Sequence, residues 1–129
     1  MSNLDWQIIR ARAKSFPEAA FQFVREGLGH TVRLQQGEGD AAAQRPRHVS
    51  GQQLSLGLRD FAIDRFGMLA GTVLRKWGVR RTEDFGTIVY GMIDSGEMRA
   101  SPEDSLEDFI SVFDFEEAFG MDRAAGAAS

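Results

Sequence analysis

The chain has 129 residues, no cysteine and a formal net charge of −4. Its hydrophobic fraction of 43%, with ten phenylalanines, indicates one folded domain rather than a disordered chain. The lack of cysteine excludes disulfides, thiol nucleophiles and thiolate metal sites. No apolar run reaches the roughly 18 residues of a membrane span, and the first residues lack the apolar segment of a secretory signal. We therefore expect a single cytoplasmic domain over 1–129 with no membrane contact.

Two helices are predicted before the first loop. Residues 4–14 can form a short helix. A longer one is expected over 17–36, with Pro17 in its first turn, where the missing N–H costs no hydrogen bond. Gly27 and Gly29 weaken this second helix by about 0.8–1 kcal/mol each relative to Ala, or else allow another helix to approach closely.

The middle of the chain carries the clearest signals, predicting helices over 50–66, 68–77 and 82–95. Ser50 and Gln53 have the spacing of a capping box, in which each side chain satisfies a backbone N–H of the other residue. Each helix is followed by a glycine suited to a C-terminal cap. These glycines are Gly67, Gly78 and Gly96.

The segments that flank this middle part are less regular. Residues 37–46 are predicted to be a flexible loop, because they are small and polar and lack periodicity, and 121–129 to be a frayed tail. Residues 97–100 and 109–115 have the composition of strands and could pair as a hairpin. Three helices followed by a hairpin is the order of a winged helix-turn-helix. We therefore expect a mainly α fold with a winged-helix-like core, and an all-α bundle is the alternative.

Charge is distributed unevenly along the chain. Residues 50–81 carry six basic and two acidic side chains, a balance of +4, whereas 82–122 carry twelve acidic and one basic, a balance of −11. Such asymmetry suggests an electrostatic partnership within the protein or with another molecule. The alternative is that both segments are simply solvated surface.

Several separated motifs occur in order along the chain. They are RHVSGQQL (47–54), FG (66–67), VL (73–74), WGVRRTEDFG (77–86) and DFEEAF (114–119). Together, over about residues 17–119, they resemble a small bacterial family known mainly from planctomycetes and verrucomicrobia. Relative to that family, 37–46 look like an insertion. The function of the family is uncharacterised, so the resemblance implies no activity and carries no catalytic or ligand residue.

The sequence offers little support for catalysis. The only histidines are His30 and His48, and no nucleophile motif accompanies them. His30 fits a packing or surface role on a helix. His48 precedes a helix start, where it can order the cap or help to hold an anion. The acidic residues of the C-terminal third lack the spacing of a calcium-binding loop. We expect no catalytic residue, no cofactor and no metal.

Two binding functions remain. The basic cluster is typical of phosphate contacts and consists of Arg75, Lys76, Arg80 and Arg81, with Arg47 and His48 as further candidates. The helix over 82–95, however, would present acidic side chains to nucleic acid and has no Arg, Lys, Asn or Gln to read base edges. Its candidate acidic docking face consists of Glu83, Asp84, Tyr90 and Asp94. We therefore favour a module that binds a protein partner or a second copy of the chain, and a nucleic-acid-binding regulator that uses the basic turn 75–81 is the alternative.

Overall fold

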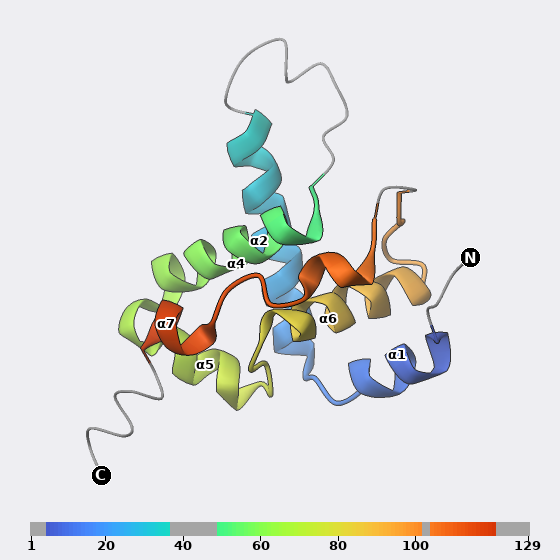
Figure 1. The fold of residues 1–129 in the computed structure, drawn as a ribbon, viewed down its shortest axis with the longest axis horizontal. Helices are drawn as coiled ribbons and strands as arrows, with labels where there is room; N and C mark the ends of the chain where they lie inside the picture. The colour runs from blue at the N-terminus through green and yellow to red at the C-terminus, as the bar shows by residue number, and fades with distance from the viewer. Residues whose placement is uncertain (1–4, 37–48, 102–103, 121–129) are drawn as a thin grey trace.

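The computed structural model describes residues 5–36, 49–101 and 104–120, and over these residues the chain is helical without any strand (Figure 1). The elements in order are α1 (Trp6–Ala13), α2 (Glu18–Gln36), α4 (Gly51–Phe66), the 3₁₀ turn η1 (Gly67–Leu69), α5 (Ala70–Lys76), α6 (Thr82–Asp94), the 3₁₀ turn η2 (Leu106–Phe109) and α7 (Phe115–Phe119). The predicted mainly α class is confirmed. The predicted flexible loop and frayed tail lie outside the described residues.

Local signals start and end the helices much as the sequence predicts. At α4 the Gln53 N–H donates to Ser50 Oγ (3.1 Å) and the Ser50 N–H donates to Gln53 Oε1 (2.9 Å), so the capping box is confirmed. Gly96 follows α6 with φ 86°, and the Glu97 N–H reaches the carbonyl of Met92 (2.9 Å). This satisfies a carbonyl that the helix end would leave unpaired.

Helix α6 is the centre of the molecule. It packs against α1, α2, α4 and η2, so neighbours cover it on several sides (Figure 1). Phe85 and Ile88 have no exposed surface, and Met92 is also buried. A helix that is apolar on most of its circumference is stable only when it is surrounded. The helix that a winged-helix arrangement would place in a DNA groove is therefore the core of the fold.

Helices α2 and α4 cross at very short range. A Cβ atom added at Gly27 would lie 2.3 Å from Leu58 Cδ2, and one added at Gly57 would lie 2.1 Å from Thr31 Oγ1. Any larger residue at either position would force the neighbouring side chain to shift. The prediction of a close helix approach is thus confirmed at Gly27, whereas Gly29 meets only the end of the Arg33 side chain, at 3.4 Å.

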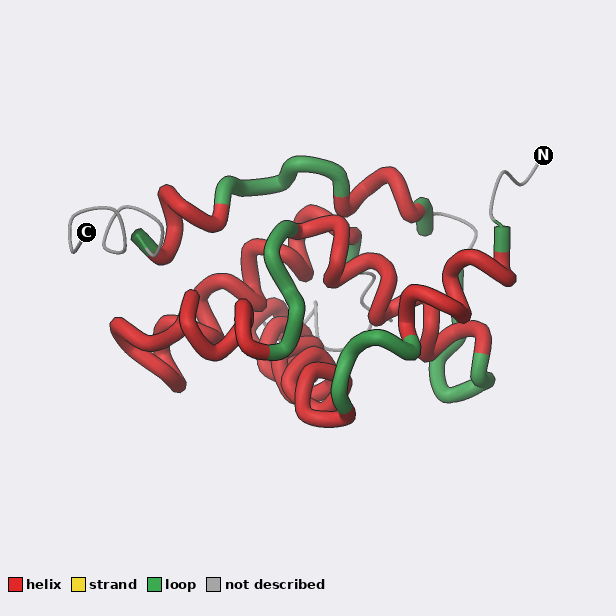
Figure 2. Tube along the Cα trace, turned by 90° about the horizontal axis from the view of Figure 1, so that it is seen from below, coloured by secondary structure: helices red, strands yellow, loops and turns green. Residues whose placement is uncertain are grey.

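The C-terminal segment crosses the helices as an outer layer, on the side opposite α2 (Figure 2). The buried Thr82 hydroxyl ties it down, donating to the Phe109 carbonyl (2.7 Å) and accepting from the Val112 N–H (3.1 Å). Phe109 is itself buried over α4 and α6. One side chain of α6 therefore holds the polypeptide that covers it.

The predicted hairpin of 97–100 with 109–115 does not form, and the winged arrangement is not confirmed. Ser111 adopts φ 49°, which breaks any extended run. The Asp114 carboxylate accepts from the Glu117 N–H (2.9 Å) and so starts α7 instead of continuing a strand. The aromatic residues of this segment thus pack through a 3₁₀ turn and a short helix rather than through alternating strand faces.

Candidate functional site between α5 and α7

The predicted acidic docking face on α6 does not exist as an exposed surface. Asp84 is part of the helix cap, because its carboxylate accepts from the backbone N–H groups of Arg80 (2.8 Å) and Arg81 (3.3 Å). The Glu83 side chain is half-buried. At least one of the acids assigned to docking therefore has a structural role at the start of α6.

Tyr90 is only 3% exposed, and its ring centroid lies 6.1 Å from that of Trp6 on α1. Burial raises the pKa of its hydroxyl, and the charges of Asp104 and Asp108 raise it further. A side chain so enclosed contributes nothing to docking. The prediction that Tyr90 belongs to a docking face is wrong.

Asp94 joins α6 to α1 through a two-pronged ion pair. Arg10 Nη2 donates to Oδ1 (2.8 Å) and Arg10 Nε donates to Oδ2 (2.9 Å). These hydrogen bonds, with the charge of Arg10, lower the pKa of Asp94. The carboxylate is therefore engaged within the protein, and the predicted acidic face separates into a cap, a buried ring and an internal ion pair.

The predicted basic cluster, unlike the acidic face, lies on the surface. Arg75 and Lys76 occupy the last turn of α5, Arg80 and Arg81 the connection to α6, and all four are exposed. Trp77 turns inward from this cluster, with its ring 5.7 Å from Phe23 and 6.0 Å from Phe66. The structure thus brings the four basic residues to one region of the surface. The other two candidates, Arg47 and His48, lie outside the described residues.

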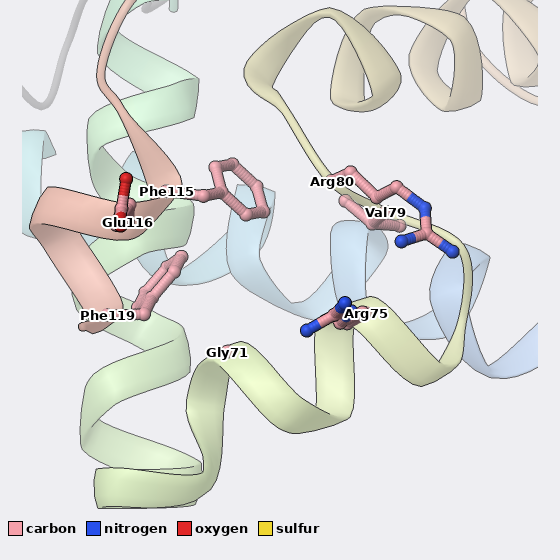
Figure 3. A pocket seen from close by; sticks show the side chains of 7 residues that line it. All are labelled: Gly71, Arg75, Val79, Arg80, Phe115, Glu116 and Phe119. Atoms are coloured by element: carbon pink, nitrogen blue, oxygen red, sulfur yellow. The ribbon is translucent and has the colours of Figure 1, made fainter. Parts of the chain in front are cut away.

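A cavity of about 140 Å³ opens beside this cluster (Figure 3). The residues that line it come from α5, the α5–α6 connection and α7: Gly71, Arg75, Val79, Arg80, Phe115, Glu116 and Phe119. Figure 3 shows the two arginines on one side and the two phenyl rings on the other, with Glu116 on α7. The cavity is therefore apolar on one wall and cationic on the other.

The aromatic wall is a packed unit. The rings of Phe115 and Phe119 meet edge to face with centroids 5.1 Å apart, and Phe113 stacks on Phe115 at 5.3 Å. Phe85 of α6 lies 5.8 Å from Phe115 and anchors the unit to the core. Sequence reasoning missed Phe115 and Phe119 as site residues. Their spacing of four, directly after a capping aspartate, was the signal that both share one helical face.

Exposed apolar side chains lie in the chain just before the residues of α5 that line the cavity. Met68 is 97% exposed and Leu69 is 62% exposed, in η1 immediately before α5. Ile63 in the last turns of α4 is exposed as well. Neighbouring apolar residues this open to water are unusual in a folded domain, whereas single ones are common.

A second, wider hollow of about 320 Å³ lies between α1, α2 and the end of α6. Its charged rim is paired within the protein: Arg10 with Asp94, and Arg25 with both Glu97 and Glu18. These hydrogen bonds raise the pKa of Arg25 and lower that of Glu97. A rim whose charges are already compensated gives no preference for a charged ligand, so we assign it a role in holding the helices together.

Over the described residues, the structure has no helix with the length and apolar character that crossing a bilayer requires. Within the same ranges, no three His, Asp or Glu side chains gather where a metal ion could be held. A comparison with protein-family models, curated protein sequences and solved structures finds no match to this chain. The resemblance to the planctomycete and verrucomicrobial family therefore stays a prediction.

Proposed function

We propose that the chain is a cytoplasmic protein-binding module without catalysis of its own. Its partner docks on the α5 face, by which we mean Met68, Leu69, Arg75, Lys76 and Arg80. The observation that carries this proposal is the exposure of Met68 and Leu69, at 97% and 62%, in the turn that leads into α5, whose Gly71 and Arg75 line the cavity.

The α5 face has the composition of a binding surface. Exposed apolar patches that are rimmed by polar side chains are typical of interaction sites. Methionine adapts its shape to a partner because its side chain is unbranched and polarizable. A bound protein would remove both apolar residues from water, at about 25 cal/mol for each Å² covered.

The absence of catalysis rests on the content of the cavity. Among the described residues, its lining combines aromatic, aliphatic, arginine and glutamate side chains with no histidine, serine or threonine, so these residues lack a hydroxyl nucleophile paired with a histidine base. At about 140 Å³ it is also smaller than the roughly 300–1,000 Å³ of ordinary small-molecule sites. These two features support a docking role over a reaction.

Nucleic-acid binding is the second candidate function, because four basic side chains share one exposed region. Two observations oppose it. The helix that would enter a groove, α6, is covered by its neighbours, and the tryptophan within the cluster packs inward. Any nucleic-acid binding would rest on phosphate contacts alone and would weaken steeply with salt.

Photo-crosslinking in cells tests the proposed function. A photoreactive amino acid is placed at Met68, and a matched control is placed at Gln7, an exposed residue of α1. We expect a specific protein to crosslink from position 68 and not from position 7. A second copy of this chain captured in this way would make the module self-associating.

The crosslinked protein is then purified and titrated against wild type and the Met68→Asp, Leu69→Asp double variant. We expect affinity to fall by roughly tenfold or more, the size typical of interface anchors. Equal affinity for both proteins, or no crosslink at position 68, would contradict the proposal. Tight binding of mixed DNA or RNA that survives physiological salt, seen by mobility shift, would favour the second candidate.

A further inference from the structure

The geometry points to the class of segment that the α5 face recognises. We propose that the cavity between Arg75, Arg80, Phe115 and Phe119 receives one apolar side chain of an acidic peptide segment, whose neighbouring carboxylates pair with the two arginines. The inference rests on the proposed function and deepens it, because it names the chemistry of the partner at one site.

The size of the cavity selects a single side chain. An apolar protein cavity of about 150 Å³ accommodates benzene, and this one measures about 140 Å³. A leucine, methionine or phenylalanine side chain is of that size, whereas a cofactor or a drug-sized molecule is larger. The occupant is therefore an anchor residue of a longer chain.

The apolar wall favours an anchor without charge. Val79 is almost fully buried beneath the cavity, and Phe115 and Phe119 are half-buried with their rings turned toward the space (Figure 3). Filling the space with an apolar side chain would cover ring surface that water now reaches, which makes a favourable contribution to binding. An aliphatic or aromatic anchor gains this contribution, and a charged one does not.

The opposite wall favours carboxylates beside the anchor. The lining residues include two arginines and one acid, Glu116, and Lys76 and Arg81 follow the two arginines directly in the chain. Guanidinium groups bind carboxylates through paired hydrogen bonds, which makes Arg the preferred residue for such recognition. The complementary peptide is acidic on both sides of its apolar residue.

The fold holds the arginine side of the cavity in place before binding. The backbone N–H of Arg80 donates to the Asp84 carboxylate (2.8 Å), and its neighbour Val79 donates through its own N–H to the Leu74 carbonyl (2.9 Å). A site whose backbone is already ordered loses less conformational entropy on binding. Asp84, predicted to dock a partner, instead positions the residue that does so.

The aromatic wall also argues against a nucleotide as occupant. A base stacks on the open face of an aromatic ring, but Phe113 stacks on Phe115, and the rings of Phe115 and Phe119 meet edge to face. The rings are engaged with each other. Together they form an apolar surface that is bent rather than flat, which suits an aliphatic side chain better than a nucleotide base.

The test uses synthetic peptides, acetylated and amidated at their ends, with Leu between two acidic residues on each side. Isothermal titration calorimetry measures their affinity for the full chain at physiological salt. We expect the acidic Leu peptide to bind, and replacement of its Leu by Ala, or of its acids by Asn and Gln, to weaken binding by about tenfold or more. Because only the peptide changes, this comparison does not depend on any variant folding.

A pair of charge-matched variants places the peptide in the cavity. Arg75→Gln with Arg80→Gln removes two lining cations, and the control Arg12→Gln with Arg33→Gln removes two exposed cations of α1 and α2 that do not line it. We expect a loss of about tenfold for the first pair and of less than about threefold for the second, with circular dichroism confirming that both remain folded. Equal losses, no peptide binding, or equal binding of the Ala peptide would overturn the proposal.

The outcomes separate this inference from the proposed function. A partner that still requires Met68 and Leu69 while the acidic peptides fail overturns the cavity assignment and leaves the docking function standing. In the converse outcome, the peptides bind as expected while the crosslinked partner binds the Met68→Asp, Leu69→Asp variant as tightly as wild type. This result supports the cavity assignment and contradicts the wider docking surface. A single-stranded oligonucleotide that displaces the peptide at physiological salt would overturn the acidic-peptide assignment.

Discussion

Helices α6 and α5 are neighbours in the chain, yet their polar residues differ in role: those of α6 bind other parts of the protein, and those of α5 lie on the surface. The acids of α6 turn to partners within the protein: Asp84 to the backbone of its own cap and Asp94 to Arg10. Helix α5 and the turn before it instead leave Met68, Leu69 and basic side chains on the surface. Charged residues on a helix thus predict a docking face only when the apolar residues of the helix do not bury it among its neighbours.

Apolar content explains the difference. Around α6, large side chains such as Phe85 and Ile88 are fully buried, and Gly86 and Gly91 allow Phe109 and Ala13 to approach. Such a helix leaves only a part of its surface to solvent. Helix α5 has seven residues, and only Ala70, Gly71 and Leu74 are buried. The rest of its surface is exposed to solvent.

The largest effect is expected in the core of α6. Replacing Phe85, which has no exposed surface, with Ala should lower the free energy of unfolding by about 3–5 kcal/mol, because it removes a ring and leaves a cavity. Denaturant unfolding followed by circular dichroism measures the change. A loss below about 1 kcal/mol would mean that α6 is not the centre of the fold.

A smaller loss of stability is expected at Thr82, whose hydroxyl is the tether that holds the outer C-terminal layer on α6. Thr82→Val keeps the shape of the side chain but leaves the Phe109 carbonyl and the Val112 N–H without their partner. Stability should fall by about 1–3 kcal/mol, the cost of an unsatisfied buried group. The matched control is Thr87→Val, whose hydroxyl makes only a long bond of 3.4 Å to the Glu83 carbonyl. Equal losses for the two variants would contradict the tether.

The ion pair of Asp94 with Arg10 should appear as a dependence of stability on pH. The native pKa of Asp94 is lowered by Arg10, so the pair contributes stability above the unfolded pKa of about 3.9. This contribution is lost as the pH falls through the lower native pKa. Asp94→Asn should therefore be less stable than wild type near neutral pH, with the gap closing in acid.

Unfolding measured across this range, with Arg10→Gln and the double variant completing a mutant cycle, checks the expectation. A gap between wild type and Asp94→Asn that stays constant down to strong acid would show that the side chain acts through packing rather than through its charge.

The smallest effect on stability is expected on the α5 face. Met68→Asp with Leu69→Asp should change the free energy of unfolding by no more than about 0.5 kcal/mol, as is usual for surface positions, while it weakens partner binding. Thermal and denaturant unfolding measure the first quantity. A loss comparable to that of Phe85→Ala would show that these residues support the fold rather than recognition.

Much of the helical framework could be predicted from local chemistry. The Ser50–Gln53 box and the glycine after α6 act within one turn of chain, so their signals are complete in the sequence. The burial of Tyr90 could not be predicted in the same way, because it depends on Trp6 and on the C-terminal layer, which are distant in sequence. The hairpin prediction failed because aromatic and branched residues suit any buried segment, and the positive φ of Ser111 decided against a strand.

The candidate site was predictable only in its cationic half. Arg75 and Arg80 stand out as a basic cluster in the sequence, whereas Phe115 and Phe119 are 40 or more residues away from Arg75 and become a wall only when Thr82 holds the C-terminal segment across the helices. Long-range packing of this kind leaves no periodic trace. The same packing places Phe115 and Phe119 opposite the two arginines and so forms the cavity.

The central claim is that recognition belongs to the surface between α5 and α7 and not to α6. The most direct measurement is a ¹H–¹⁵N correlation spectrum of the full chain during titration with the acidic Leu peptide. We predict that the largest chemical-shift changes fall on the amides of Gly71, Arg75, Arg80, Phe115 and Phe119, with those of Tyr90 and Asp94 unmoved. Changes centred on the α6 residues Tyr90 and Asp94, or no changes at saturating peptide, would contradict it.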